Sequence, residues 1–518
     1  MRLVPDESAD PLVVATAAGE VRGISARGLR LWRGIPYAAS PVGVRRLRSP
    51  DPAVTWEGIR AADVFGPVAP QDRNGQFLGP KANVPMDEDC LTINVIAPAG
   101  SAPELRPVMV FVHGGAYSVG SAREVPHLGE GLVRQGDVVF VNFNYRLGAL
   151  GYIDFTSYST PARRFDSNLG LRDQVAALEW VRDNIHAFGG DPGNVTLFGE
   201  SAGGNAVTTL MTVPSARGLF ARAIAQSSPA NAIYPPGITA TWAADYVELL
   251  SGVVDNLSTD STTHEDAADL LAGAPAEALV AATTLLQLAT PDSRPGTICL
   301  SPVIDGEFLP ERPLDAFKAG RAHPVPLIIG TNDREGSLFR GRLDILATTP
   351  PRIRAIFART RKKSRKALKA QYPGLPEPRA AADFAGDYAF WFPSIKVAER
   401  HSRFAPVHFY RFDVAPRLLR LMGLDATHGL ELFALFDRMD GWFGRAMGSL
   451  GGRRSFKKTG SRMQRHWVSF ARDGSVGSEW PRYTDRRRKT LVFDVTDRVE
   501  LDPRRDRRKA WQDFVPHV

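Results

Sequence analysis

Cysteine is scarce in this sequence, since Cys90 and Cys299 are the only two among 518 residues. A disulfide scaffold is excluded, because the chain can form at most one internal bridge. Neither cysteine lies in a Cys-x-x-Cys pattern or beside a cluster of other metal-binding side chains. We therefore expect no zinc site and no other bound metal ion.

Long hydrophobic runs are also missing. No stretch reaches 18 consecutive apolar residues, so we expect no transmembrane segment. The first ten residues contain no apolar core of signal-peptide length. The sequence thus predicts a cytoplasmic protein, although removal of a leader would leave the same pattern.

The overall composition is ordinary for a globular protein, with 43% hydrophobic, 9% aromatic and 23% charged residues. These fractions exclude disordered, collagen-like and coiled-coil chains. The sequence has no internal repeat and no long Gly/Ser-rich or Pro-rich linker, so we expect a single domain over residues 1–518. Residues 230–300 and 340–400 have helical patterns and are expected to form cap insertions over a sheet.

The net charge is +8, which raises nucleic acid or an anionic membrane as a partner. Residues 352–369 hold nine Lys/Arg and no acid, and residues 453–510 hold 18 Lys/Arg against 8 Asp/Glu. The remaining 442 residues carry a net −11. We expect the first segment to be a solvated cap helix and the second a basic C-terminal face. No nucleic-acid recognition motif is present, so we expect no nucleic-acid partner, and contact with an anionic surface stays open.

Short apolar runs alternate with helical patterns along the chain. Unalternating apolar runs are typical of strands that are buried on both faces of a parallel sheet. These runs are residues 107–112, 138–143, 195–198, 326–329 and 407–412. Residues 171–188 lie between the second and third runs and have apolar side chains at helical spacing. The alternation predicts an α/β fold with a mostly parallel central sheet flanked by helices.

A Gly-x-Ser-x-Gly motif follows the third predicted strand and precedes a helical pattern. In Gly199-Glu200-Ser201-Ala202-Gly203, a sharp strand-to-helix turn would lift the Ser201 hydroxyl clear of the sheet. Bulky residues at the two glycine positions would collide within such a turn. The alternative is a glycine-rich turn with an ordinary capping serine. The predicted strand before the motif and the helix after it favour the nucleophile over this alternative.

The first predicted strand ends in His113-Gly114-Gly115-Ala116. Consecutive glycines allow backbone N–H groups to approach a substrate oxygen closely. A serine hydrolase needs such donors for the developing oxyanion. Gly114, Gly115 and Ala202 are the candidates, and a simple tight turn is the alternative.

Several long motifs resemble one family. Residues 188–203 are similar to the serine-site signature of the type-B carboxylesterases, which include the cholinesterases and the bacterial p-nitrobenzyl esterases. Residues 88–95 resemble the second signature of that family, and further matches extend from about residue 15 to about residue 495. The resemblance implies an α/β-hydrolase fold and ester hydrolysis without a cofactor.

A serine nucleophile needs a base, which is usually a histidine oriented by a carboxylate. In the α/β-hydrolase order the acid and then the histidine follow the serine, each after a strand. His428 fits this order, and residues 425–432 resemble the catalytic-histidine loop of the family, although Asp425 stands near a position where the family usually has Gly. Four other histidines fit less well because of their position or pattern: His113, His264, His408 and His466.

The acid should follow the fourth predicted strand. Residues 330–336 resemble the acid loop of the family, in which the Glu before Gly belongs to the triad, and this implies Glu335. Asp333 is the rival carboxylate and reads as a solvated loop residue or turn former.

The resemblance also implies supporting residues. Glu200 corresponds to an extra carboxylate that adds negative potential near the imidazolium. Ser227 corresponds to a buried serine that hydrogen-bonds the acid, although Ser228 stands where the family usually has Gly. Secreted members pair the cysteine of the second signature with an upstream cysteine, which Cys90 lacks, and two free thiols fit a reducing compartment. Residues 391–392 either line a substrate pocket or belong to the core.

These patterns together predict a serine esterase that acts on a small-molecule ester. Ser201 would form the acyl-enzyme, His428 would act as base and Glu335 would orient it. The alternatives are a catalytically silent adhesion member of the same fold and a hydrolase of carbamates or amides, which share the chemistry.

Overall fold

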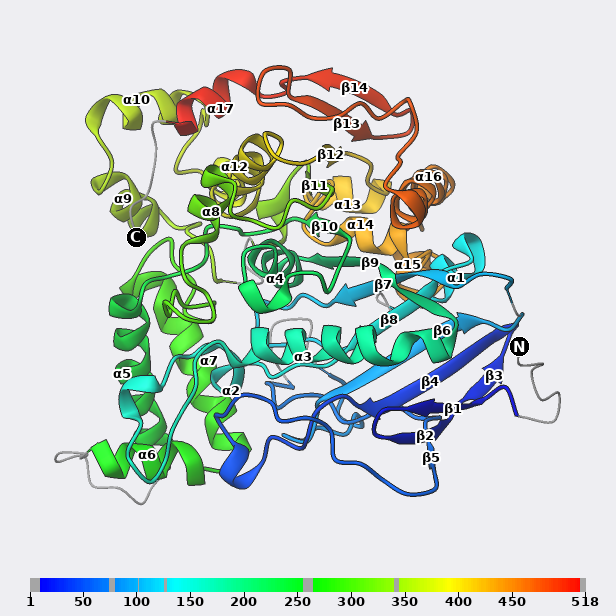
Figure 1. Ribbon diagram of the computed structural model, residues 1–518. Coiled ribbons are helices and arrows are strands. Elements are labelled where there is room, and N and C mark those ends of the chain that lie inside the picture. The colour runs from blue at the N-terminus through cyan, green and yellow to red at the C-terminus, as the bar shows by residue number, and fades with distance from the viewer. Residues whose placement is uncertain are drawn as a thin grey trace.

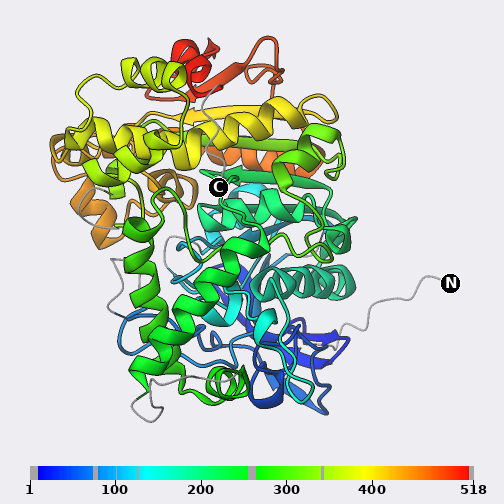
Figure 2. The ribbon, with the colours of Figure 1, turned by 90° about the vertical axis from the view of Figure 1, so that its left-hand side faces the viewer.

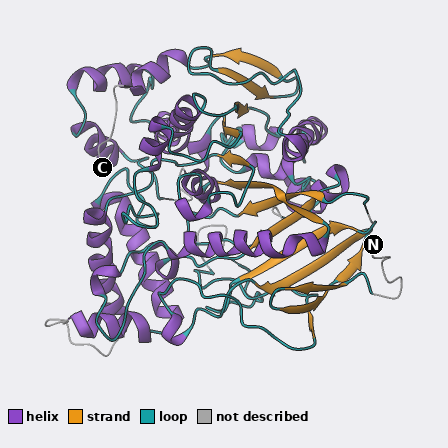
Figure 3. Ribbon diagram, in the orientation of Figure 1, coloured by secondary structure: helices purple, strands orange, loops and turns teal. Residues whose placement is uncertain are grey.

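The computed structural model describes residues 10–73, 80–100, 102–124, 128–254, 264–339 and 344–512. A large twisted sheet runs through the molecule, and helices lie on both of its faces (Figure 1, Figure 3). A second, small sheet lies near the N-terminal edge.

The strands are β1 (Val13–Thr16), β2 (Gly19–Arg22), β3 (Ile24–Ala26), β4 (Leu29–Pro36), β5 (Ile59–Ala61), β6 (Thr92–Pro98), β7 (Arg106–Val112), β8 (Val139–Phe143), β9 (Gly190–Glu200), β10 (Arg222–Gln226), β11 (Leu327–Asn332), β12 (Val407–Phe412), β13 (Lys489–Phe493) and β14 (Arg498–Leu501). The helices are α1 (Glu130–Gly136), α2 (Ala149–Tyr152), α3 (Leu169–Asn184), α4 (Ala202–Leu210), α5 (Pro236–Val253), α6 (His264–Gly273), α7 (Ala276–Ser293), α8 (Pro313–Ala319), α9 (Pro350–Ala358), α10 (Lys362–Ala370), α11 (Pro378–Gly386), α12 (Phe392–His401), α13 (Arg417–Leu421), α14 (Leu430–Leu435), α15 (Trp442–Met447), α16 (Arg453–Asp473) and α17 (Arg505–Gln512).

The large sheet has the strand order β14-β13-β12-β11-β10-β9-β7-β8-β6-β4-β3. The neighbouring pairs from β8 to β13 are parallel, and the outer pairs at both edges are antiparallel. The prediction of a mostly parallel sheet is therefore confirmed. All five predicted strands are present as β7, β8, β9, β11 and β12.

Strand β10 was not predicted. It lies between β9 and β11 in the centre of the sheet, and its apolar run, residues 223–225, is only three residues long. So short a run between polar residues gives a weak signal for a strand.

Alternate side chains of the central strands enter two different cores, because successive residues of a strand point to opposite faces. Val110 packs with the side that α3, α4 and α12 cover, whereas Phe111 packs with the side that α1 and α16 cover. This burial on both faces explains why these strands read as unbroken apolar runs.

The two predicted cap regions are largely helical in the described residues. Helices α5, α6 and α7 fall within 230–300. Helices α9, α10 and α11 fall within 340–400, and α12 ends one residue beyond it, at His401. The treatment of the chain as a single domain stays a prediction.

No single helix in the described ranges is long and apolar enough to cross a membrane. The segment Ala267–Gly273 and helix α7 reach the required length and composition only as a pair, and they are bent by 114° relative to each other.

Residues 352–369 were expected to form one solvated helix, but they form two, α9 and α10. Most of the cations in this segment are exposed, as expected, whereas Arg352 is buried. The Arg352 guanidinium bonds to the carboxylates of Asp292 (2.7 Å) and Asp344 (2.5 Å). It therefore ties α9 to the end of α7.

Candidate active site

Ser201 stands at a sharp turn between β9, which ends at Glu200, and α4, which begins at Ala202. Its backbone angles are φ 60° and ψ −122°, a conformation that non-glycine residues rarely adopt. A Cβ atom at Gly203 would lie 2.1 Å from the carbonyl oxygen of Val112, and one at Gly199 would lie 2.6 Å from the backbone of Gly203. Close packing of the turn against β7 therefore requires both glycines.

Glu335 and His428 are joined by a hydrogen bond. Glu335 follows β11, and its Oε2 atom lies 2.6 Å from Nδ1 of His428, on the loop between α13 and α14. Both side chains are buried. The rival carboxylate Asp333 instead pairs with Arg504 at 2.6 Å.

Two donors hold the other oxygen of Glu335. The Ser227 hydroxyl and the Asn332 backbone N–H each donate to Oε1 at 2.6 Å. The neighbouring Ser228 hydroxyl instead lies 3.0 Å from that of Thr208. Of the two neighbouring serines, it is therefore Ser227, and not Ser228, that contacts the carboxylate of Glu335.

The second imidazole nitrogen of His428 faces Glu200. Nε2 lies 3.2 Å from Oε1 of Glu200 and makes no hydrogen bond within the described residues. Ser201 lines the same cavity as both side chains. The structure thus gathers Ser201, Glu200 and His428 at one wall, with Glu335 behind the imidazole.

The imidazole and its neighbours perturb one another's protonation. Burial by itself would lower the pKa of His428, but the Glu200 and Glu335 carboxylates outweigh it and raise this pKa to about 9. Burial raises the pKa of Glu200 well above its usual range, against the opposing pull of His428. The charged imidazolium is therefore stabilised at this position, which favours holding a proton once His428 has accepted it, whereas acceptance itself requires the neutral imidazole.

The glycine loop after β7 offers free backbone donors. In the described part of the chain, the N–H groups of Gly114, Gly115 and Ala202 have no protein acceptor. A Cβ at Gly115, whose φ is 113°, would lie 1.9 Å from the carbonyl oxygen of Val119. Only glycine fits at position 115, so the loop conformation depends on it.

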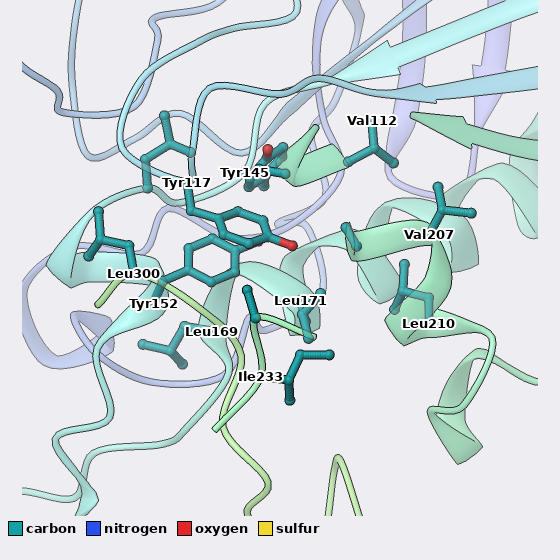
Figure 4. Close-up of a cluster of buried hydrophobic side chains, with 14 of the residues drawn as sticks. Val112, Tyr117, Tyr145, Tyr152, Leu169, Leu171, Val207, Leu210, Ile233 and Leu300 are labelled. Carbon is teal, nitrogen blue, oxygen red and sulfur yellow. The ribbon is translucent and has the colours of Figure 1, made fainter. Parts of the chain in front are cut away.

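Three buried tyrosines lie beside this loop, and Figure 4 shows Tyr145 close to the overlapping rings of Tyr117 and Tyr152. The Tyr145 hydroxyl donates to the carbonyl oxygen of His113 at 2.7 Å, and the Tyr117 hydroxyl donates to Asn205 of α4 at 2.8 Å. Tyr117 also stacks on Tyr152 with ring centroids 3.8 Å apart. These contacts hold the loop rigidly beside the serine turn.

Three buried polar residues of the site were not foreseen from the sequence, namely Gln226, Asn332 and Glu431. The Asn332 amide donates to the Thr427 carbonyl oxygen at 2.7 Å and also to the carboxylate of Glu431. Gln226 donates to the other oxygen of Glu431 at 3.3 Å. A lone acid in the apolar run 430–436, three residues after the histidine, is the signal that could have revealed Glu431.

Phe390 was missed as well. Its ring lies 4.3 Å from the His428 ring, centroid to centroid, and it lines the cavity. A wide helical turn over Asp387–Trp391 sets its position. Trp391 and Phe392 themselves belong to the hydrophobic core, so the core alternative is the one that the structure supports for them.

Asp425 adopts a left-handed backbone conformation, with φ 52°. Glycine is the default residue for such a position, which explains why a family pattern would have Gly there. In this chain the Asp425 carboxylate pairs with Arg334 at 2.7 Å, and this interaction fixes the loop that leads to His428.

The cavity has a volume of about 1220 Å³. Its walls are mainly apolar and come from the glycine loop, α7, the turn after β11 and the segment from α13 to α15. Ser201, Glu200 and His428 are among the polar residues that line it. Such a pocket suits a predominantly apolar molecule with one reactive polar group.

No group of three metal-ligating side chains occurs among the described residues. Cys90 and Cys299 are both buried and unpaired. Burial raises the pKa of Cys299 to about 11 and that of Cys90 even higher, so both thiols stay protonated at neutral pH.

Comparison with known proteins places the chain in a family. The profile of the carboxylesterase family matches residues 10–511. The para-nitrobenzyl esterase of Bacillus subtilis (strain 168) is 35% identical over 503 residues, covering 96% of this chain and 98% of that protein. The phenmedipham hydrolase of Pseudarthrobacter oxydans is 30% identical, covering 91% and 92%. The solved structure of a thermophilic p-nitrobenzyl esterase superposes with a TM-score of 0.85 at 34% identity, covering 98% of this chain and all of that one. The chain therefore belongs to the carboxylesterase family, with its α/β-hydrolase fold, and is a carboxylic ester hydrolase.

Proposed function

We propose that the protein hydrolyses small carboxylic esters through an acyl-enzyme on Ser201. His428 is the base, Glu335 orients it, and the N–H groups of Gly114, Gly115 and Ala202 form the oxyanion hole. The observation that carries the proposal is the 2.6 Å bond between Glu335 and His428, beside a serine held at a strained turn.

In the first half of the reaction, His428 Nε2 takes the proton of the Ser201 hydroxyl as its oxygen attacks the ester carbonyl. The carbonyl oxygen becomes negative and is stabilised by the backbone donors of the glycine loop and of α4. The imidazolium then gives its proton to the departing alcohol, which leaves an acyl group on Ser201.

In the second half, a water molecule loses a proton to His428 and attacks the acyl carbon. The tetrahedral intermediate collapses, the proton returns to Ser201, and the acid is released. Glu335 keeps Nδ1 protonated throughout, so that Nε2 is the nitrogen available to the serine. Glu200, 3.2 Å from Nε2, stabilises the imidazolium in both halves.

The experiment is a comparison of Ser201→Ala with the wild type on p-nitrophenyl esters. Turnover should fall to background, and covalent labelling by an organophosphonate probe should disappear. Ser118→Ala is the matched control, since Ser118 carries another hydroxyl in the same cavity and should keep the labelling. Undiminished turnover in Ser201→Ala would refute the proposal.

The silent adhesion alternative is disfavoured because Ser201, Glu335 and His428 are all present. Carbamates and amides need the same nucleophile and oxyanion donors, so a substrate panel that includes them belongs with the ester assays. The cytoplasmic location and the absence of a nucleic-acid partner stay predictions from the sequence.

A further inference from the structure

Large apolar side chains are exposed around the mouth of the cavity. Leu421 is 76% exposed and Trp442 is 74% exposed, although residues of this kind are normally buried. The apolar rim, as we call it, consists of Leu288, Leu421, Met422, Trp442, Phe443 and Leu450.

The apolar rim is continuous with the substrate cavity. Four of its members also line the cavity, namely Leu288, Met422, Trp442 and Phe443. Leu288 comes from α7 on one side of the mouth, and the other members come from α13, α15 and the residues that follow them. In Figure 2, the green helices α5–α7 and the orange α15 lie on the same side of the molecule.

Cations lie beside the apolar rim without matching acids. Arg417, Arg420 and Arg445 are exposed on α13 and α15, and no ion pair to a described carboxylate is formed by any of them. The two exposed acids in this region, Asp437 and Asp440, are already paired with Lys457 and Arg453. The region therefore presents apolar side chains together with an excess of positive charge.

We propose that the apolar rim and Arg417, Arg420 and Arg445 adsorb the protein onto anionic lipid–water interfaces, with the cavity mouth facing the lipid. Apolar side chains that enter the acyl boundary, together with basic residues at the headgroups, are the combination that binds such interfaces. The inference that the bound lipid phase supplies ester substrates rests on the proposed function, whereas adsorption itself does not.

A lipid surface fits this region better than a protein partner does. A protein bound to both sides of the cavity entrance would block access to the cavity. A lipid phase would cover the apolar rim and could still deliver an apolar ester into the cavity. The basic helix α10 is a weaker candidate for the same role. No large apolar side chain is exposed on it among the described residues, and it does not border the cavity.

The test is co-sedimentation of the full chain with vesicles of phosphatidylcholine alone or with one third phosphatidylglycerol. The wild type should bind the anionic vesicles and bind more weakly as salt is raised. The double variant Leu421→Ser/Leu450→Ser should bind about tenfold more weakly. The double variant Arg417→Gln/Arg420→Gln should bind the anionic vesicles about 25-fold more weakly, because each cation near such a surface raises the binding affinity about fivefold. Its binding to phosphatidylcholine vesicles should not change.

Matched controls separate this surface from general effects. Leu501→Ser removes an apolar side chain that is 68% exposed on the distant strand β14 and should bind like the wild type. Lys362→Gln/Lys366→Gln removes two charges from α10 and should also bind normally. The Leu421/Leu450 and Arg417/Arg420 variants should keep wild-type turnover of dissolved p-nitrophenyl acetate, because none of these four residues lines the cavity. Unchanged turnover would also show that the variants fold.

Three results would overturn the proposal. The first is no binding of the wild type to anionic vesicles, and the second is unchanged binding of both the Leu421/Leu450 and the Arg417/Arg420 variants. The third is loss of binding in the α10 variant alone. Ser201→Ala should adsorb normally while hydrolysing nothing. Failure of the proposed reaction and failure of adsorption are therefore distinguishable.

Discussion

Replacing Glu200 by glutamine should move the acid limb of the pH–rate profile to lower pH. His428 can accept the serine proton only when its imidazole is neutral, so kcat/KM should fall as the pH drops through the pKa of His428. The carboxylates of Glu200 and Glu335 raise that pKa to about 9. In the wild type the acid limb should therefore lie near pH 9.

The size of the change follows from the distance. Two unit charges 3.2 Å apart interact by about 5 kcal/mol at an effective dielectric constant of about 20. Burial raises the pKa of Glu200, so this carboxyl carries only part of its charge near neutral pH. We therefore expect the pKa of His428 to decrease by about 1–2 in the variant.

The same attraction stabilises the imidazolium that forms in the transition state. A pKa difference of 1 corresponds to about 1.4 kcal/mol, so each such decrease in the pKa of His428 should lower the plateau value of kcat/KM by up to about tenfold. The variant should thus be slower at its optimum and yet retain a larger fraction of its activity at pH 7.

The assay is kcat/KM for a p-nitrophenyl ester between pH 5 and pH 10, with p-nitrophenol release corrected for its own ionisation. Glu431→Gln is the matched control, because Glu431 is equally buried but is the weakest of the carboxylate contributions at His428. It should move the limb less than Glu200→Gln does. A lower plateau with an unchanged acid limb in Glu200→Gln would refute the reasoning.

Three further substitutions test two contacts of the site and one buried ion pair of the core. Gly203→Ala would put a Cβ 2.1 Å from the Val112 carbonyl oxygen and should destabilise the protein by about 3 kcal/mol or more in urea unfolding, with loss of activity; a stable, active variant would contradict the packing argument. Ser227→Ala removes one of the two donors to Glu335 and should lower kcat about tenfold with little change in KM, measured on p-nitrophenyl esters; an unchanged kcat would mean that this bond does not orient the acid. Arg146→Leu would leave the fully buried Asp173 carboxylate unpaired, so the free energy of unfolding should fall by about 3–5 kcal/mol; a thermal shift no larger than that of a surface Arg→Leu control would contradict this.

The serine turn could be read from the sequence because the motif that forms it is local. A strand, two glycines and a helix lie within a few residues, and the collisions that exclude other residues at 199 and 203 involve the turn and its neighbour β7. Glu335 and His428 are 93 residues apart, and no local pattern brings them together. Their pairing was predicted only through the order of elements and the family resemblance.

The unpredicted parts of the site depend on packing between distant segments. Asn332 reaches Thr427 and Glu431 across nearly one hundred residues, and the ring of Phe390 reaches His428 from the wide helical turn between α11 and α12. A sequence pattern needs several residues at regular spacing, so a single polar or aromatic residue within an apolar run does not reveal which distant residue it contacts. Asp425 is the intermediate case, because its departure from the family pattern was visible in the sequence, whereas its left-handed backbone conformation is known only from the structure.

A formal sum of charges is a weak guide to the surface of this protein. Many cations of residues 453–510 are neutralised by specific acids, as in the pairs Arg462–Asp497 at 2.6 Å and Arg508–Asp502 at 2.7 Å. Arg417, Arg420 and Arg445 lie outside both basic segments that the sequence singles out. The field that a ligand or membrane meets depends on which charges remain unpaired and exposed, and that depends on the fold. Helix α10 also carries exposed cations, so unpaired charge alone does not single out the region beside the cavity. The exposed apolar side chains of the apolar rim, which the described residues of α10 lack, make that region the stronger candidate for a lipid surface.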